Sequence, residues 1–499
     1  MRDASTAPTP PGTGPATPDT ARPAVTTPRP AEATRARTAV PAQPPGPQTG
    51  LRAGPHPGAE RPGPPPTPRT PSSAPPPGEP AGEPATATER RFWALQHTAG
   101  HPAAALTFGR FRLTGPVDLP ALAVALRAVR ERHEGLRTAY TVRGGTLLAQ
   151  VVDRPVEHEP LVLPSGTAPG DALRLLRAGP APDATRADLL RWAVVPLPDG
   201  ADLYLAVHHI AFDGASGEVL AADLAHAYAQ ALAGERPRPA PAPRHRAQPL
   251  APARRTEHEA YWQHALAGLA ELPDDGRGLT RRELLRDMLV QRSVRLGAAE
   301  AATLRERARS VAATSFAVLL AAYARALSAL AGVRDFAVGT AVADRRAGTE
   351  QEVGCLFTMV PVPVRDPLAP DCVPRLWQAV VDCVLHAGLP LENIVRAAGA
   401  GRGRRMPLYQ ATFLLQNWPR HAHHAGPVTV RTVPVPPSAP QAEVLLELYD
   451  DGHGPVHGVL QAPSRSVWAD RLTSLADRWH QEALLTAAGS GTCAPRPGP

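Results

Sequence analysis

The residues best suited to chemistry lie in one short string, AVHHIAFDGASGEVL, which contains His208, His209, Asp213 and Gly214. A histidine pair followed by an aspartate is either a structural feature or a metal site. The alternating residues before it predict a strand over Asp202–Ile210, and neighbouring side chains of a strand point to opposite faces. A shared metal ion is therefore disfavoured, since the two histidines point apart and Asp213 lies past the strand end, so that no third ligand is placed on the same face. The pattern predicts that one histidine packs while the other faces a cavity.

The elements that must position this string alternate between strands and helices. Ahead of it, the periodicity predicts further strands over Leu106–Leu113 and Thr146–Val152. A helix begins after the first of these, with Asp118 as its N-cap. The string itself leads into a helix predicted over Glu218–Ala233.

The second half of the chain repeats this mixture. Strands and helices are intermixed in both halves, so the sequence predicts an α/β fold built from α+β layers. The predicted helices are Glu257–Leu266, Ala299–Ser310, Thr314–Leu330 and Trp468–Leu485, and the predicted strands are Asp335–Val342, Met359–Val364, Tyr409–Leu415 and Glu443–Tyr449.

Composition sets the domain boundaries. Of the 61 prolines among 499 residues, 25 fall in the first 84 residues, which contain no Phe, Trp, Tyr or Ile. Such a stretch cannot bury enough apolar surface to offset the ordering of its backbone, so residues 1–84 are predicted to be a disordered tail. The Pro/Arg-rich residues 234–256 are predicted to link an N-terminal lobe, 85–233, to a C-terminal lobe, 257–490, and residues 491–499 form a second disordered tail.

Charge and cysteine usage exclude several classes of protein. The net charge is only +7, no lysine is present, and no arginine run with interleaved aromatic residues suggests nucleic-acid binding. The cysteines, Cys355, Cys372, Cys383 and Cys493, show no C-x-x-C spacing, and the N-terminus has no apolar signal region. The most apolar segment, from Val311, is interrupted by Arg325. We therefore expect a soluble, cytoplasmic protein with no nucleic-acid or membrane partner.

The string HHIAFDG resembles the HHxxxDG signature of the condensation-domain superfamily of nonribosomal peptide synthesis, which is related to chloramphenicol acetyltransferase. Further stretches resemble other motifs of this family in the family's order, and together they cover most of the predicted globular part. They are ATATERRFWAL (Ala85–Leu95), RHEGLRTAY (Arg132–Tyr140), DFAVGTAVADR (Asp335–Arg345), VGCLFTMVPVPVR (Val353–Arg365), LPLENIV (Leu389–Val395) and MPLYQATFLLQN (Met406–Asn417).

The resemblance implies a fold of two chloramphenicol-acetyltransferase-like lobes that form a V around a central tunnel. It also implies the partners. An acyl or peptidyl carrier protein would bring a thioester on its phosphopantetheine arm, and a small-molecule nucleophile or a second carrier protein would supply the other substrate. The chain would need no cofactor or metal of its own.

Family position makes His209 the expected catalytic residue, and its place on the predicted strand agrees. It would accept the nucleophile's proton or position the nucleophile. Asp213 would accept a salt bridge from either Arg137 or Arg345, and Gly214 would offer its N–H to the thioester carbonyl.

Two further residues of the string are expected to have supporting roles. His208 is expected mainly to pack, and Ser216 to cap the following helix. Outside the string, the HAHH run (His421, His423, His424) has metal-like spacing but is predicted to be a loop. Cys355 is expected to be a packing residue.

Three functions remain open. The favoured one is a freestanding condensation enzyme that forms an amide, acting in trans on carrier proteins because no adenylation or carrier domain follows in the sequence. The second is an ester-forming O-acyltransferase of the same fold. The third is a non-catalytic recruiting module, although such modules tend to have a degraded histidine motif and this one is intact.

Overall fold

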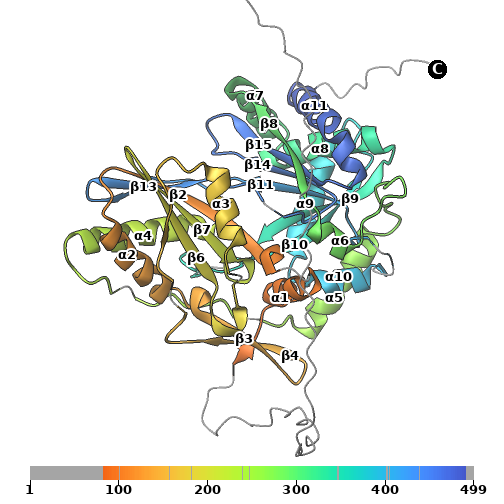
Figure 1. Ribbon diagram of the computed structural model, residues 1–499. Helices are drawn as coiled ribbons and strands as arrows, with labels where there is room; N and C mark the ends of the chain where they lie inside the picture. Colours follow the sequence, from red (N-terminus) through yellow and green to blue (C-terminus); the bar gives the residue numbers. More distant parts are fainter. Residues whose placement is uncertain are drawn as a thin grey trace, which may run out of the picture. The chain divides into compact units, whose positions relative to one another are not determined.

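Two six-stranded sheets, each with helices packed on it, form the framework of the protein (Figure 1). The computed structural model describes residues 82–489, except residues 100–101, 157, 181, 239, 247, 346–347, 401–402, 404 and 438. Nearly all of the predicted tail 1–84 and all of the tail 491–499 lie outside the described residues. Strands and helices are mixed along the chain, as the sequence predicts.

The first sheet, which we call the N-terminal sheet, is centred on β7 and has the order β12-β13-β2-β7-β6-β5. The alternation predicted for β7 is observed, because Leu203 and Leu205 pack with the residues of α4 while Tyr204 packs with α3 on the other face. Its elements are β2 (Leu106–Thr114), β5 (Leu161–Val162), β6 (Leu190–Leu197), β7 (Gly200–His208), β12 (His423–Ala425), β13 (Val428–Val433), α2 (Leu119–Arg132), α3 (Pro169–Ala178) and α4 (Ser216–Leu232).

Two strands of the N-terminal sheet come from the second half of the chain. β13 pairs antiparallel with β2, with Val430 opposite Leu113, and β12 continues the sheet beyond it. These strands were not predicted, and they lie within the region 257–490 assigned to the C-terminal lobe. The predicted lobe boundary therefore does not separate the two sheets. The pairing covers the edge of β2, which would otherwise present unpaired backbone groups.

The second sheet, the C-terminal sheet, has the order β10-β9-β11-β14-β15-β8. The strands predicted at 335–342, 359–364, 409–415 and 443–449 are all present, with ends that differ by one or two residues. Its elements are β8 (Leu289–Leu296), β9 (Asp335–Ala343), β10 (Phe357–Arg365), β11 (Ala411–Gln416), β14 (Val444–Tyr449), β15 (Val456–Pro463), α5 (Pro252–Ala265), α6 (Arg281–Arg286), α7 (Ala298–Ser310), α8 (Ser315–Ala331), α9 (Cys372–Leu385), α10 (Leu391–Ala397) and α11 (Val467–Ala487).

Helix α8 is the most apolar segment of the chain, and its ends are set by local chemistry. The Thr314 side chain accepts a hydrogen bond from the Ala317 amide at the N-terminus, and Gly332 closes the C-terminus with a φ of 71°. The helix lies in the core against α11 and the C-terminal sheet. Within residues 82–489, no single helix is long and apolar enough to span a membrane.

A small sheet ties the start of the described chain to the predicted linker. It consists of β1 (Glu83–Pro84), β4 (Thr146–Val151) and β3 (Thr138–Arg143), and α1 (Ala87–Ala99) follows it. Glu89 of α1 accepts two hydrogen bonds from Arg244, both 3.1 Å long, and one from the hydroxyl of Tyr140. Arg244 is buried, so part of the predicted linker is packed into the protein.

Candidate active site

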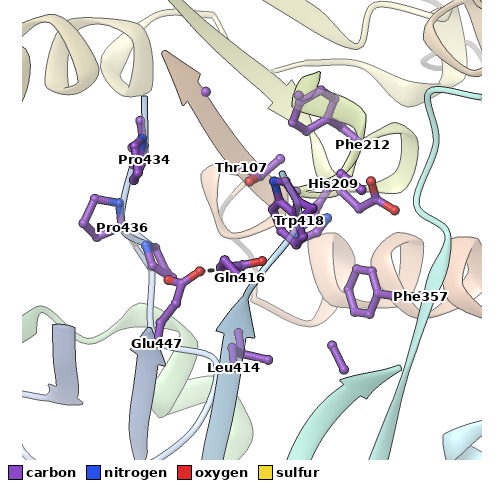
Figure 2. A pocket seen from close by; sticks show the side chains of 18 of the residues that line it. Thr107, His209, Phe212, Phe357, Leu414, Gln416, Trp418, Pro434, Pro436 and Glu447 are labelled. Carbon is purple, nitrogen blue, oxygen red and sulfur yellow. Dashed lines mark hydrogen bonds between the residues drawn. The ribbon is translucent and has the colours of Figure 1, made fainter. Parts of the chain in front are cut away.

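Residues from both halves of the chain line one cavity of about 440 Å³ (Figure 2). Strand β2 and the residues that follow β7 contribute from the N-terminal half, and β9, β10, β11 and β14 contribute from the C-terminal half. A proline-rich segment between β13 and β14 completes the lining. Among the residues singled out from the sequence, His209, Asp213, Gly214 and Arg345 all line this cavity.

His209 stands in an aromatic environment at the wall of the cavity. Its ring stacks on Phe92, with 4.2 Å between ring centroids, and Phe357 lies 5.6 Å away (Figure 2). The Nδ1 atom is 3.7 Å from the sulfur of Cys355. Burial lowers the pKa of His209 to about 4, against the opposing effects of nearby backbone carbonyls and of Asp213. The ring is therefore neutral at physiological pH.

The local structure at His209 differs from the predicted strand. β7 ends at His208, and His209 begins a short 3-10 turn, η4 (His209–Ala211). Strand alternation therefore does not set the direction of the His209 side chain. The turn carries it to the cavity instead.

His208 fixes this turn. Its Nε2 atom lies 2.7 Å from the side-chain oxygen of Gln96, and its Nδ1 accepts a hydrogen bond from the Ile210 amide. Only 1% of the residue is exposed, and burial lowers its pKa to about 3. A neutral, fully bonded His208 stabilises the chain on either side of His209.

Asp213 joins the two halves of the chain. Its Oδ1 atom is 2.8 Å from Nη2 of Arg345, and its Oδ2 accepts a hydrogen bond from the Leu356 amide at 3.0 Å. Of the two arginines considered from the sequence, Arg345 is thus the one that contacts Asp213. Arg137 instead donates to the carbonyls of Glu131 and Val152.

Ser216 does not cap helix α4 as expected. It is the first residue of that helix, and its hydroxyl donates to Asp213 Oδ1 at 2.7 Å and lies 3.0 Å from the carbonyl oxygen of Gly354. The Asp213 carboxylate itself accepts a hydrogen bond from the Ser216 amide at 2.8 Å. Asp213 therefore accepts a hydrogen bond from a backbone amide at the start of α4, and Ser216 adds a second connection to the loop that carries Cys355.

Gly214 is pressed against an aromatic side chain from the other half. A Cβ atom at this position would lie 2.4 Å from the ring of Trp418, so no larger residue fits without movement. The side-chain oxygen of Gln416 would be 3.4 Å from the same Cβ. The amide hydrogen of Gly214 has no acceptor within the described part of the chain.

A carboxyl group that the sequence analysis did not identify also lines the cavity. Glu447 on β14 accepts a hydrogen bond from the side-chain amide of Gln416 on the neighbouring strand β11 (Figure 2). Only 4% of Glu447 is exposed, and burial raises its pKa to about 7, which the hydrogen bond from Gln416 opposes. Its position in VLLELY indicated only a strand, and no spacing in the sequence connects it to His209.

Metal ligands do not assemble in the described residues. No group of three or more histidine, cysteine or acidic side chains in the range 82–489 is arranged to hold an ion. In the HAHH run, His423 lies 3.6 Å from Glu218 and His424 contacts Thr429 across the hairpin of β12 and β13. The run is therefore partly strand rather than loop. Cys355 is a buried free thiol whose pKa burial raises well above its usual value. Cys493 lies outside the described residues.

Comparison with known proteins identifies the family. The model of the condensation domain matches residues 83–437 of this chain. The chain belongs to the condensation-domain family. Tyrocidine synthase 2 of Brevibacillus parabrevis is 30% identical to this condensation domain over 354 residues, and the match covers 68% of the chain and 10% of the synthase. Phosphinothricin tripeptide synthetase PhsC of Streptomyces viridochromogenes is 29% identical over 360 residues, which is 67% of this chain and 32% of the synthetase.

Solved structures agree with this assignment. The X-domain from teicoplanin biosynthesis is 25% identical to the condensation domain described here, with a TM-score of 0.68 over 83% of this chain and 97% of that chain. The condensation domain of the monacolin K polyketide synthase MokA shares the fold, with a TM-score of 0.66 and 22% identity over 82% of this chain and 98% of that one. The family is thus one of nonribosomal peptide synthesis, and the chain spans only a minor part of the curated relatives that it matches.

The site residues of this condensation domain that the sequence did not reveal contact the histidine motif in space but lie far from it in the chain. Phe92 stacks on His209, and although it lies within the stretch Ala85–Leu95, the sequence did not single it out. Trp418 lies beyond the end of MPLYQATFLLQN, and its contact with Gly214 depends on the packing of the two halves. An aromatic residue just past a motif was the only available signal.

Proposed function

We propose that this condensation domain transfers an acyl or aminoacyl group from the phosphopantetheine thioester of a carrier protein to an amine, forming an amide in nonribosomal peptide or related secondary-metabolite biosynthesis. One observation carries the proposal. His209 of an intact HHxxxDG motif stands, uncharged, in the wall of a cavity that both halves of the chain line. Such a cavity has room for two substrates that meet at one side chain.

In the proposed reaction the amine nitrogen attacks the thioester carbonyl. A C–N bond forms and the C–S bond breaks, and the proton that the nitrogen loses ends on the departing sulfur, so that a thiol remains on the carrier protein's arm. His209 accepts a hydrogen bond from the amine and holds it against the carbonyl, so that proximity supplies much of the rate. The condensation domain needs no cofactor of its own for these steps.

The low pKa of His209 supports an amine over an alcohol as nucleophile. A base with a pKa of about 4 removes a proton weakly, and an alcohol needs strong assistance from a base. An α-amino group, whose pKa is about 7.7–8.0, is partly neutral near pH 7 and can attack without losing a proton first. The ester-forming alternative is therefore less well supported than amide formation.

The neighbouring residues receive supporting roles in this proposal. Gly214 offers its unpaired amide hydrogen to the carbonyl oxygen, where negative charge develops in the transition state. Asp213 acts as a positioning residue, because its bonds to Arg345 and to the Leu356 amide fix the loop that carries Gly214. His208 and Ser216 stabilise the same loop. The proposed substrates, carried on acyl or peptidyl carrier proteins, imply a cytoplasmic site of action.

The test is single-turnover transfer from loaded carrier proteins, followed by intact mass measurement of the carrier. The carrier is offered with a panel of amines and matched alcohols, to the wild type and to His209→Ala, at pH 7 and pH 9. We expect amide products, a loss of rate in His209→Ala, and partial recovery of that rate at pH 9 as more amine becomes neutral. Ester products alone, or a defect unchanged at pH 9, would favour the O-acyltransferase.

A recruiting role is the second candidate, and the likeness to the X-domain favours it. That domain has been solved in complex with OxyB from the same biosynthesis. If the wild type and His209→Ala transfer the acyl group at equal rates at both pH values, His209 has no catalytic role. The recruiting role is then the better explanation.

A further inference from the structure

Glu447 and Gln416 form a pair of side chains on one face of the C-terminal sheet. Their strands run parallel, and Glu447 is in register with Leu414, two residues before Gln416. The Gln416 amide group donates its hydrogen to Oε1 of Glu447. This bond fixes the orientation of the amide, so the Gln416 oxygen points away from the carboxyl group. That oxygen lies 3.4 Å from where a Cβ of Gly214 would stand, on the side of the histidine motif.

Two oxygen atoms of this pair lack a donor. Oε2 of Glu447 is buried and has no hydrogen-bond partner within the described residues. The Tyr449 side chain, two residues along the same strand, interacts with the Glu447 carboxyl group and opposes the rise in its pKa, but Oε2 itself has no hydrogen-bond partner within the described residues. The side-chain oxygen of Gln416 likewise has no donor in the part of the chain that the structure describes. A buried carboxyl oxygen without a donor is costly, and such groups usually serve a ligand or a reaction.

Within the described residues, no cation forms an ion pair with the carboxyl group of Glu447. Arg420 lines the same cavity and its charge slightly opposes the rise in the pKa of Glu447, but its guanidinium lies over the ring of Tyr449, 5.3 Å from the centroid, and makes no direct contact with the carboxyl group. The other walls near the pair are apolar, and they include Leu414, Pro434 and Pro436 (Figure 2). The site therefore combines an unpaired acidic group with walls suited to methylene groups.

We propose that the Glu447–Gln416 pair binds an ammonium group of the acceptor substrate, separate from the amine that reacts at His209. An ammonium group has three donors and no acceptor, which matches a buried carboxyl oxygen and an amide oxygen that both lack a donor. The ammonium site differs from the site of reaction. Gln416 lies between them, because its side-chain oxygen is near Gly214 and its amide group is bonded to Glu447. The acceptor is thus a diamine or an amino acid derivative with a basic side chain. This inference rests on the proposed function.

The test compares L-lysine amide with L-norleucine amide, which has a similar chain but no second amino group. Binding to the full chain is measured by isothermal titration calorimetry, so no acyl donor is needed. We expect lysine amide to bind about ten- to a hundredfold more tightly than norleucine amide, the usual effect of one charge-assisted hydrogen bond. Glu447→Gln abolishes this preference and leaves the affinity for norleucine amide unchanged.

Two further variants keep the test decisive. Gln416→Leu removes the second oxygen without altering the carboxyl group, and it too should reduce the preference for lysine amide. Asp477→Asn removes an exposed carboxylate on α11 and should leave the preference for lysine amide as it is in the wild type. Equal binding of the two amides by the wild type, or a preference that survives in folded Glu447→Gln or Gln416→Leu protein, overturns the inference.

A transfer assay with the same two amides separates this inference from the proposed function. If both amides accept the acyl group equally well and bind equally, the ammonium site is wrong and the acyltransferase stands. If lysine amide binds through Glu447 but neither amide is ever acylated, the ammonium site stands and the acyltransferase is wrong.

Discussion

Asp213 and Arg345, 132 positions apart in the chain, meet at 2.8 Å directly beside the histidine motif. The same carboxylate accepts hydrogen bonds from Ser216 and from the Leu356 amide, and the arginine also donates to the carbonyl of Glu352. One largely buried ion pair thus connects the loop after β7 to the loop before β10.

Replacing Asp213 with Ala should destabilise the protein strongly. It leaves Arg345 and the Leu356 amide without their acceptor in a buried site, where loss of one partner of an ion pair costs about 3–5 kcal/mol. Asp213→Asn keeps the shape and some hydrogen bonds and should cost less. Chemical denaturation of both variants gives the measurement. Asp213→Ala protein with unchanged stability and no activity would refute the positioning role and indicate direct chemistry.

The histidine pair should remain neutral well below the usual histidine pKa. Burial lowers the pKa of His209 to about 4 and that of His208 to about 3. Because the unfolded chain binds these protons near pH 6.5, their contribution to stability is fully present above that pH and declines as the pH falls toward 4. NMR of protein labelled with ¹⁵N-histidine, assigned with His209→Asn, should show no protonation of either ring between pH 8 and pH 5. Titration of either ring near pH 6.5 would contradict the prediction that both histidines stay neutral.

Glu447 should produce a pH dependence of the opposite sign. Burial raises its pKa from 4.5 to about 7, so the folded protein binds a proton that the unfolded chain has already released. Its contribution to stability is present below about pH 4.5 and is lost as the pH rises through 7, by at most about 3 kcal/mol. In thermal melts, the melting temperature of Glu447→Gln relative to that of the wild type should therefore rise from pH 5 to pH 8. A difference that does not change with pH would mean that the carboxyl group is already ionised at pH 5.

Gly214→Ala should disturb the contact between the two halves. The added methyl group would lie 2.4 Å from the Trp418 ring, and overpacking of this kind typically costs about 1–3 kcal/mol. Gly217→Ala is the matched control, because its Cβ would meet nothing closer than 3.9 Å. In a double-mutant cycle, Trp418→Leu should recover much of the loss caused by Gly214→Ala. Additive effects would show that the two residues do not press on each other.

Much of the fold was predictable because its elements have local signals. Strand β2 and helix α2 follow from hydrophobic periodicity and from the N-cap at Asp118, whose side chain accepts a hydrogen bond from the Ala121 amide. Strand β13 was missed because VTVRTV is short, lies among prolines, and is stabilised by pairing with a strand more than 300 positions earlier. The predicted tail also extended slightly too far, because Glu83 and Pro84 already pair with β4.

The candidate site was predictable to the extent that it lies in one motif. His209, Asp213 and Gly214 are close in sequence, and all three line the cavity. The choice between Arg137 and Arg345, the contact of Trp418 with Gly214, and the presence of Glu447 depend on which strands become neighbours. No periodicity within a segment contains that information.

Two strands of the second half complete the sheet of the first half, and this sets a limit on engineering. β12 and β13 belong by sequence to the second half and by hydrogen bonding to the first sheet. A chimaera joined anywhere in residues 234–256 would pair β2 of one parent with β13 of another, and all five register partners from Thr429 to Val433 would have to match. A half expressed alone would expose an open strand edge and be prone to self-association. Recombination of such domains should therefore preserve β2 and β13 as one unit, however far apart they are in the gene.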